Sequence, residues 1–187
     1  EMVLAIKPDF ADAYNNLGVA FLNLDQLDKA VKSYKAALKL NPNFVEAINN
    51  LGIGLYNLGQ MEDAIKSYEK VIAIQPDFVK AYNNLGNALM ELGQLDEALE
   101  SYKAALKLKP DFVEAINNLG ITFYKLHQLD DAMNCYDRAL VLDPDFADAH
   151  NNIGTVLLER GQLNDAVKSY KEALKLKPEF VEALNNM

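Results

Sequence analysis

Apolar residues recur along the chain at alternating spacings of three and four, which place side chains on one face of an α-helix. In residues 11–44 the pattern forms two runs separated by a short break. The first run contains Ala13, Tyr14, Leu17, Gly18, Ala20 and Phe21, and the second contains Leu27, Ala30, Val31, Tyr34, Ala37 and Leu38. The spacing therefore predicts two amphipathic helices joined by a turn.

This two-helix pattern repeats every 34 residues along the whole chain. All six prolines are evenly spaced at that interval: Pro8, Pro42, Pro76, Pro110, Pro144 and Pro178. The glycines Gly18, Gly52, Gly86, Gly120 and Gly154 follow it too. So do Asn-Asn pairs that begin at Asn15, Asn49, Asn83, Asn117, Asn151 and Asn185. A fixed period of this length indicates a stack of repeats rather than a domain with one central core.

The period sets the expected boundaries. We expect one all-α solenoid over residues 1–187, with five full repeats at 11–44, 45–78, 79–112, 113–146 and 147–180. Residues 1–10 would be the tail of a preceding repeat, and residues 181–187 the start of a further one. The sequence thus has the pattern of a fragment of a longer array.

The breaks between the runs predict how the helices end. Gly59, Gly93 and Gly161 stand where a left-handed residue would end the first helix of a repeat, and Asp25 and His127 take that place in two others. Each proline should end the second helix, because proline disfavours a helical conformation in the residue before it. The expected N-caps are Asp28, Asp96, Asp130 and Asn164 for second helices, and Asp9, Asn43, Asp77, Asp111 and Asp145 for first helices.

The repeated residues resemble the tetratricopeptide repeat family. The positions that carry the resemblance in the first repeat are Leu17, Gly18, Phe21, Ala30, Tyr34, Ala37 and Pro42, and the later repeats match with minor changes. The resemblance covers the whole chain. It implies a right-handed superhelix of antiparallel helix pairs, in which the first helices line a concave groove that holds peptides.

A second period lies on top of the first. The segments Ser33–Tyr56 and Ser101–Tyr124 are nearly identical and lie two repeat lengths apart. This spacing suggests duplication of a two-repeat unit. The groove would then present a surface that nearly repeats itself.

Composition and charge exclude several functions. The net charge of −9 argues against a nucleic-acid partner, because it would repel a phosphate backbone. No apolar run approaches the roughly 18 residues needed to span a membrane, so we expect a soluble chain, and we place it in the cytoplasm. One cysteine and two histidines are too few for a zinc site, and no catalytic motif is present. We therefore expect no enzyme activity, no metal and no cofactor, and we interpret Cys135, His127 and His150 as structural.

The asparagine pairs are the strongest candidate site. On a helical wheel, both asparagines of a pair fall opposite the core face of the first helix. Asparagine destabilises a helix interior, so its recurrence there indicates a function. The predicted groove residues are Asn15, Asn16, Val19, Asn49, Asn50, Ile53, Tyr56, Asn83, Asn84, Asn87, Met90, Asn117, Asn118, Ile121, Tyr124, Asn151 and Asn152. A row of amides can hydrogen-bond an extended peptide backbone. Alternatively, one asparagine of each pair bonds to the neighbouring helix and holds the stack in register; we expect both roles.

This amide row resembles the repeat arms of the O-linked N-acetylglucosamine transferases and their bacterial relatives. It departs from the subfamily that clamps chaperone tails with basic residues, because Lys80 is the only basic residue at the second position of a repeat. Acidic residues hold that position elsewhere, at Asp12, Glu46, Glu114, Asp148 and Glu182. We interpret them as favourable charges at helix N-termini, or as an anionic rim for a basic partner.

Three functions follow. The first is a non-catalytic scaffold that binds a peptide segment of another protein in its groove. The second is the substrate-recruiting arm of a larger enzyme such as a glycosyltransferase. The third is head-to-tail self-association, since both ends of the chain fall within a repeat and carry apolar residues such as Leu4 and Leu184.

Overall fold

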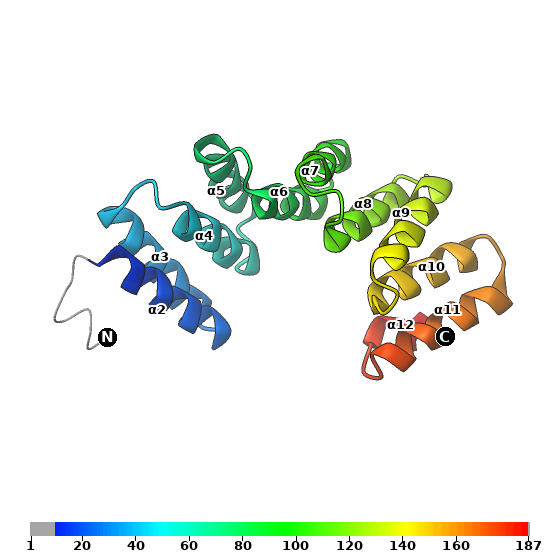
Figure 1. Cartoon of the computed structure of the whole chain (residues 1–187). Helices are drawn as coiled ribbons and strands as arrows, with labels where there is room; N and C mark the ends of the chain where they lie inside the picture. Colours follow the sequence, from blue (N-terminus) through cyan, green and yellow to red (C-terminus); the bar gives the residue numbers. More distant parts are fainter. Residues whose placement is uncertain (1–9, 187) are drawn as a thin grey trace. The chain divides into compact units, whose positions relative to one another are not determined.

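The computed structural model describes residues 10–186, and every regular element in that range is an α-helix, which confirms the predicted all-α fold (Figure 1). The chain forms two compact units that divide between Gln94 and Leu95. The first unit contains α2 (Ala11–Asn23), α3 (Leu27–Leu40), α4 (Val45–Asn57), α5 (Met61–Ile74) and α6 (Val79–Glu91). The second contains α7 (Leu95–Leu108), α8 (Val113–Lys125), α9 (Leu129–Leu142), α10 (Ala147–Glu159), α11 (Leu163–Leu176) and α12 (Val181–Asn186).

A glycine and a tyrosine join the two helices of a repeat. Gly52 of α4 lies beneath the buried ring of Tyr68 from α5, and a Cβ atom at residue 52 would fall 2.5 Å from Tyr68 Cε1. The equivalent close approaches are Gly18 to Tyr34, Gly120 to Tyr136 and Gly154 to Tyr170. Glycine is therefore required at this position so that the aromatic ring can pack directly on the helix backbone.

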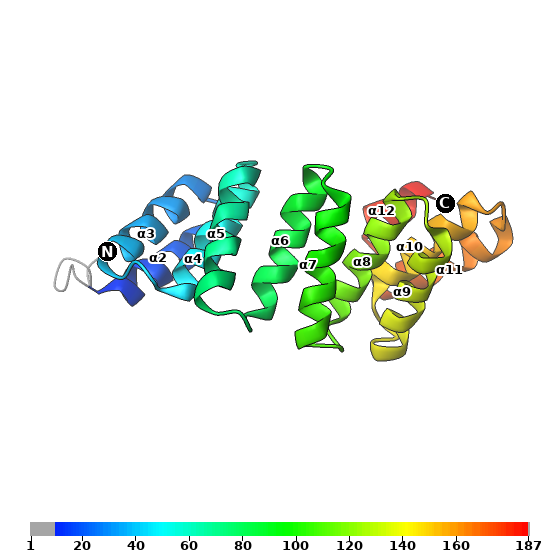
Figure 2. The same ribbon diagram turned by 90° about the horizontal axis from the view of Figure 1, so that it is seen from above.

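Within each unit, apolar clusters join helices of successive repeats. In the first unit, Val31 of α3, Leu55 of α4 and Ala88 of α6 belong to one buried cluster, so α4 contributes to the core on both of its sides. In the second unit, Ala173 of α11 packs with Phe180 and with Ala183 of α12. Within each unit, successive helices lie side by side (Figure 2). Within each unit, the core is thus shared between neighbouring repeats, as expected for a repeat protein.

The predicted helix ends are confirmed. Gly59, Gly93 and Gly161 have φ values of 74–75°, in the left-handed region. Asp25 and His127 take the same conformation with φ of 55° and 57°. Each second helix with a described cap stops two residues before its proline, and the intervening residue is extended, as at Asn41 with φ −132° and ψ 93°.

The predicted N-caps are wrong. Second helices begin one residue before the proposed caps, so Asp28, Asp96, Asp130 and Asn164 lie within the first helical turn. First helices are capped by phenylalanine backbone, as at Phe44, and the described caps make no side-chain hydrogen bond. Asp9 lies outside the described residues, whereas Asn43, Asp77, Asp111 and Asp145 precede those caps.

The inter-helix turns explain why the side-chain caps are not needed. Gln26 N donates to Phe21 O over 2.9 Å, so the turn after the first helix closes through its own backbone. In the turns before α4 and α10, a side chain closes the turn instead. Asn41 Oδ1 accepts a hydrogen bond from Asn43 N, and Asp143 Oδ1 accepts one from Asp145 N. Such Asx turns fix the chain direction at the proline.

We predict that Gly52→Ala lowers the free energy of unfolding by about 1–3 kcal/mol, because the added methyl group would overlap the buried Tyr68 ring. Gly54→Ala is the matched control in the same helix. Its Cβ would lie 3.0 Å from Val31 Cγ2, and alanine already stands at this repeat position in Ala20 and Ala88. Urea unfolding followed by circular dichroism measures both variants. Equal stability of the two would contradict the role assigned to the glycine.

Candidate functional site

The first asparagine of each pair is buried in the structure. The side chains of Asn15, Asn49, Asn83, Asn117 and Asn151 are 5–8% exposed. The helical wheel placed these side chains on the solvated side, and that placement is wrong. A wheel of one helix omits the neighbouring first helix, and α2 packs on α4, α4 on α6, α8 on α10, and α10 on α12.

Side-chain amides bridge successive first helices. The second asparagine of one repeat donates from Nδ2 to Oδ1 of the first asparagine in the preceding repeat. The bonds are Asn50 to Asn15 at 3.0 Å, Asn84 to Asn49 at 3.3 Å, Asn152 to Asn117 at 2.9 Å, and Asn186 to Asn151 at 3.3 Å. Each of these bonds has the same separation in sequence, so the bridge repeats with the fold. The alternative in which the asparagines hold the stack in register is therefore observed.

The second column of asparagines is more accessible than the first. Asn16 is exposed, and Asn50, Asn84, Asn118 and Asn152 are half-buried. An amide group has two N–H donors and an oxygen with two lone pairs, and the bridge uses one of those N–H groups. Bridging therefore fixes the orientation of the amide without using all of its hydrogen-bonding capacity.

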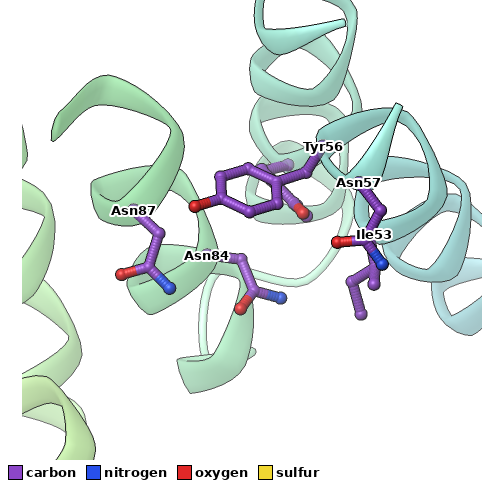
Figure 3. A pocket seen from close by; sticks show the side chains of 6 residues that line it. Ile53, Tyr56, Asn57, Asn84 and Asn87 are labelled. Atoms are coloured by element: carbon purple, nitrogen blue, oxygen red, sulfur yellow. The ribbon is translucent and has the colours of Figure 1, made fainter. Parts of the chain in front are cut away.

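Two pockets open beside these amides, one in each unit. The first has a volume of about 240 Å³ and lies between α4, α5 and α6; it is lined by Ile53, Tyr56, Asn57, Tyr68, Asn84 and Asn87 (Figure 3). The second has a volume of about 250 Å³ and is lined by Ile121, Tyr124, Lys125, Tyr136, Asn152 and Thr155. Each lining position of the second pocket lies two repeat lengths after its counterpart in the first. The two pockets therefore have the same spacing as the nearly identical segments of the sequence.

Each pocket combines apolar walls with neutral hydrogen-bonding groups. In the first, the side chain of Tyr56 reaches from α4 toward Asn87 on α6, while Ile53 and Asn57 line the α4 side (Figure 3). Tyr68 of α5 is 2% exposed and also lines the pocket. Burial, and then the nearby Tyr56, raise the pKa of Tyr68, and burial also raises that of Tyr136. The phenols therefore stay protonated and can donate hydrogen bonds.

One carboxylate stands next to each pocket tyrosine. Burial raises the pKa of Tyr56, and the negative charge of Glu91 raises it further. Burial likewise raises the pKa of Tyr124, and a hydrogen bond to Glu159 adds to the effect. Glu91 and Glu159 hold the same repeat position, so both pockets have a negative group at the same place.

The pockets contain seven of the predicted groove residues. Ile53, Tyr56, Asn84 and Asn87 come together in the first pocket, and Ile121, Tyr124 and Asn152 in the second. Half-buried Val19 and Met90 line neither of them. Sequence reasoning missed Asn57, Lys125, Thr155, Tyr68 and Tyr136 as lining residues. Asn57, Lys125 and Thr155 lie on the same side of the helical wheel as the predicted residues, and this position could have identified them. Tyr68 and Tyr136 have the sequence pattern of core tyrosines and gave no such sign.

Cys135, His150 and His127 lie outside the linings of the two pockets. Cys135 is half-buried, and burial is the main cause that raises its thiol pKa to about 11. His150 Nε2 lies 3.0 Å from Pro144 O, and Tyr82 at the same repeat position donates its hydroxyl to Pro76 O over 3.1 Å. Exposed His127 lies with Nδ1 3.6 Å from Glu159 Oε1.

Residues 10–186 contain neither a cluster of metal ligands nor a helix that could span a membrane. Within that range, no three His, Cys, Asp or Glu side chains gather as a metal site would require. The helices of the same range are also too short or too polar to traverse a lipid bilayer.

Comparisons with known proteins agree with the repeat architecture. The sequence profile of the cilia and flagella-associated protein 70 C-terminal domain matches residues 45–184, and the tetratricopeptide repeat profile matches residues 11–44. No curated protein sequence matches the chain.

Solved structures share the fold. A crystal structure of MamA is 28% identical with a TM-score of 0.75, and the alignment covers 87% of this chain and 95% of that one. A tetratricopeptide protein of Thermus thermophilus is 24% identical with a TM-score of 0.81, covering 94% and 96%. YrrB, described as having an unusual peptide-binding site, is 22% identical with a TM-score of 0.71, covering 98% and 95%. The last two show similarity of fold alone.

We predict that Asn49→Ala lowers the free energy of unfolding by about 1–2 kcal/mol, because Asn84 Nδ2 loses its buried acceptor. Asn16→Ala is the matched control, since its side chain is exposed, and it should stay within about 0.5 kcal/mol of the parent. Urea denaturation measures both. A destabilisation by Asn16→Ala as large as that by Asn49→Ala would show that the bridge contributes nothing specific.

Proposed function

Because the chain belongs to the tetratricopeptide repeat family, we propose that it is a non-catalytic interaction module that binds a peptide segment of a partner protein. In each unit, the binding surface is formed by the second-column asparagines of that unit and the pocket beside them. The pair of equivalent pockets is the observation that carries this proposal. They repeat at the spacing of the duplicated sequence and combine the same apolar, phenolic and amide groups.

The size of the pockets supports a peptide over a small-molecule ligand. Sites for drug-sized molecules measure roughly 300–1,000 Å³ and enclose most of the ligand. Volumes of about 240 and 250 Å³ suit one amino-acid side chain each. Asn84 lines the first pocket and Asn152 lines the second, and the amide bridges fix the orientation of both side chains. Each amide can therefore hydrogen-bond the backbone of a segment whose side chain enters its pocket.

The same surface serves a free-standing adaptor or the substrate-recruiting arm of a larger enzyme. In the second case, the chemistry lies outside these residues. Both functions give the two pockets the same role in recognition.

We predict that the double variant Tyr56→Leu, Tyr124→Leu weakens binding of selected peptides by at least about tenfold, because tyrosines of this kind carry much of the affinity at interfaces. The parent is first panned against a random dodecapeptide library, and the best peptides are synthesised for calorimetry. Leucine already stands at this repeat position in Leu22 and Leu158, so the variant should fold.

The control is the double variant Tyr14→Ile, Tyr82→Ile, which removes two tyrosines that line neither pocket. Isoleucine stands at that repeat position in Ile48 and Ile116. The control should keep the parent affinity. A library that returns no peptide, or equal losses in both double variants, would overturn the proposed function.

Self-association is a second proposal, supported by a different observation. Val181 and Leu184 of α12 are 61% and 54% exposed, and they would be covered by a second copy in a head-to-tail contact. We predict that the mass measured by light scattering rises with concentration and that Leu184→Glu lowers it. A mass that stays at 20.8 kDa over a wide concentration range would contradict this proposal.

A further inference from the structure

The two pockets differ in charge although their positions are equivalent. Among the six lining positions, isoleucine, both tyrosines and one asparagine are shared. Two positions change: Asn57 becomes Lys125, and Asn87 becomes Thr155. The exchange of Asn57 for Lys125 is the only one that alters the formal charge. The chain thus contains two versions of one pocket that differ by a single cation.

The second exchange is chemically milder. Thr155 Oγ1 donates to Asn151 O over 3.1 Å and accepts from Tyr170 at 3.4 Å, so its hydroxyl is engaged within the fold. Asn87 is a neutral amide on the same wall of the first pocket, where the Tyr56 hydroxyl points toward it (Figure 3). Neither side chain adds a charge.

A glutamate at the same repeat position in each unit determines which side-chain charge each pocket favours. In the first unit, Glu91 lies one helical turn after the pocket residue Asn87 on α6, and no residue that lines this pocket is cationic. In the second, Glu159 bonds to Tyr124, lies 3.6 Å from His127 Nδ1, and is accompanied by Lys125 on the pocket wall. The local charge is therefore negative at the first pocket and offset at the second.

We propose that the pockets of the two units select different side chains of a peptide ligand: the first takes a lysine or arginine, and the second takes an uncharged side chain. This inference rests on the proposed function. In the first pocket, the methylene stem of the basic residue lies against Ile53 and the Tyr56 ring, and its cationic head meets Glu91. In the second, Lys125 repels such a head. Asn57 and Lys125 are thus specificity-determining residues, one in each unit.

The test uses dodecapeptides selected from a random library on the parent protein. Those peptides should be enriched in lysine or arginine at one position. Each selected peptide is resynthesised with norleucine in place of that basic residue, which keeps the stem and removes the charge. Calorimetry then compares both peptides on the parent, Asn57→Lys, Glu91→Gln and Lys125→Asn. Asn57→Lys should fold because lysine stands at the same repeat position in Lys125.

The expected results form a double-mutant cycle. The parent should prefer the basic peptide by about fivefold at low salt, as for partly exposed ion pairs, and less at high salt. Asn57→Lys and Glu91→Gln should remove most of that preference and leave the norleucine peptide unaffected. Lys125→Asn should leave the preference at the first pocket unchanged and let the second pocket accept a basic side chain.

The outcomes separate this inference from the proposed function. Peptides that bind without a basic preference, or a preference that survives in both Asn57→Lys and Glu91→Gln, would overturn the charge selection and leave peptide binding standing. A library that returns no peptide for the parent would overturn both.

Discussion

The contact between a first-helix glycine and a second-helix tyrosine is the constraint on which each repeat depends. Gly52 lets the ring of Tyr68 pack directly on the backbone of α4, so the two helices approach closely and the ring is almost fully buried. The same ring then lines the first pocket from behind. Helix packing and the candidate binding surface therefore share one side chain, which is why the pocket position is set by the repeat rather than by a loop.

The asparagine pairs divide two tasks between neighbouring residues. The first member is buried and accepts a hydrogen bond, as Asn49 does from Asn84, so polar groups at the helix interface are satisfied. The second member reaches across the interface and lies at the edge of a pocket. Because the bridge fixes the amide orientation in advance, a bound segment would not have to order it, and less conformational entropy would be lost on binding.

The two pockets lie two repeats apart, and this spacing explains why their walls are alike. Equivalent positions two repeat lengths apart keep the walls alike, while one exchange, Asn57 for Lys125, changes the charge. A repeat protein can vary one site in this way without disturbing the fold, because each repeat contacts only its neighbours. Selectivity for a partner can therefore be distributed over several small pockets.

The sequence alone determined the helix pairs, their period, the left-handed turns at Gly59 and His127, and the helix ends before proline. These features depend on local conformational preferences and on spacing along one chain segment. Only the tertiary structure decided that Asn49 is buried, that first helices are capped by backbone instead of side chains, and that Asn57 and Tyr68 meet in one pocket. Those features arise where one repeat packs on the next, and a pattern read along a single helix does not contain the surface that its neighbour covers.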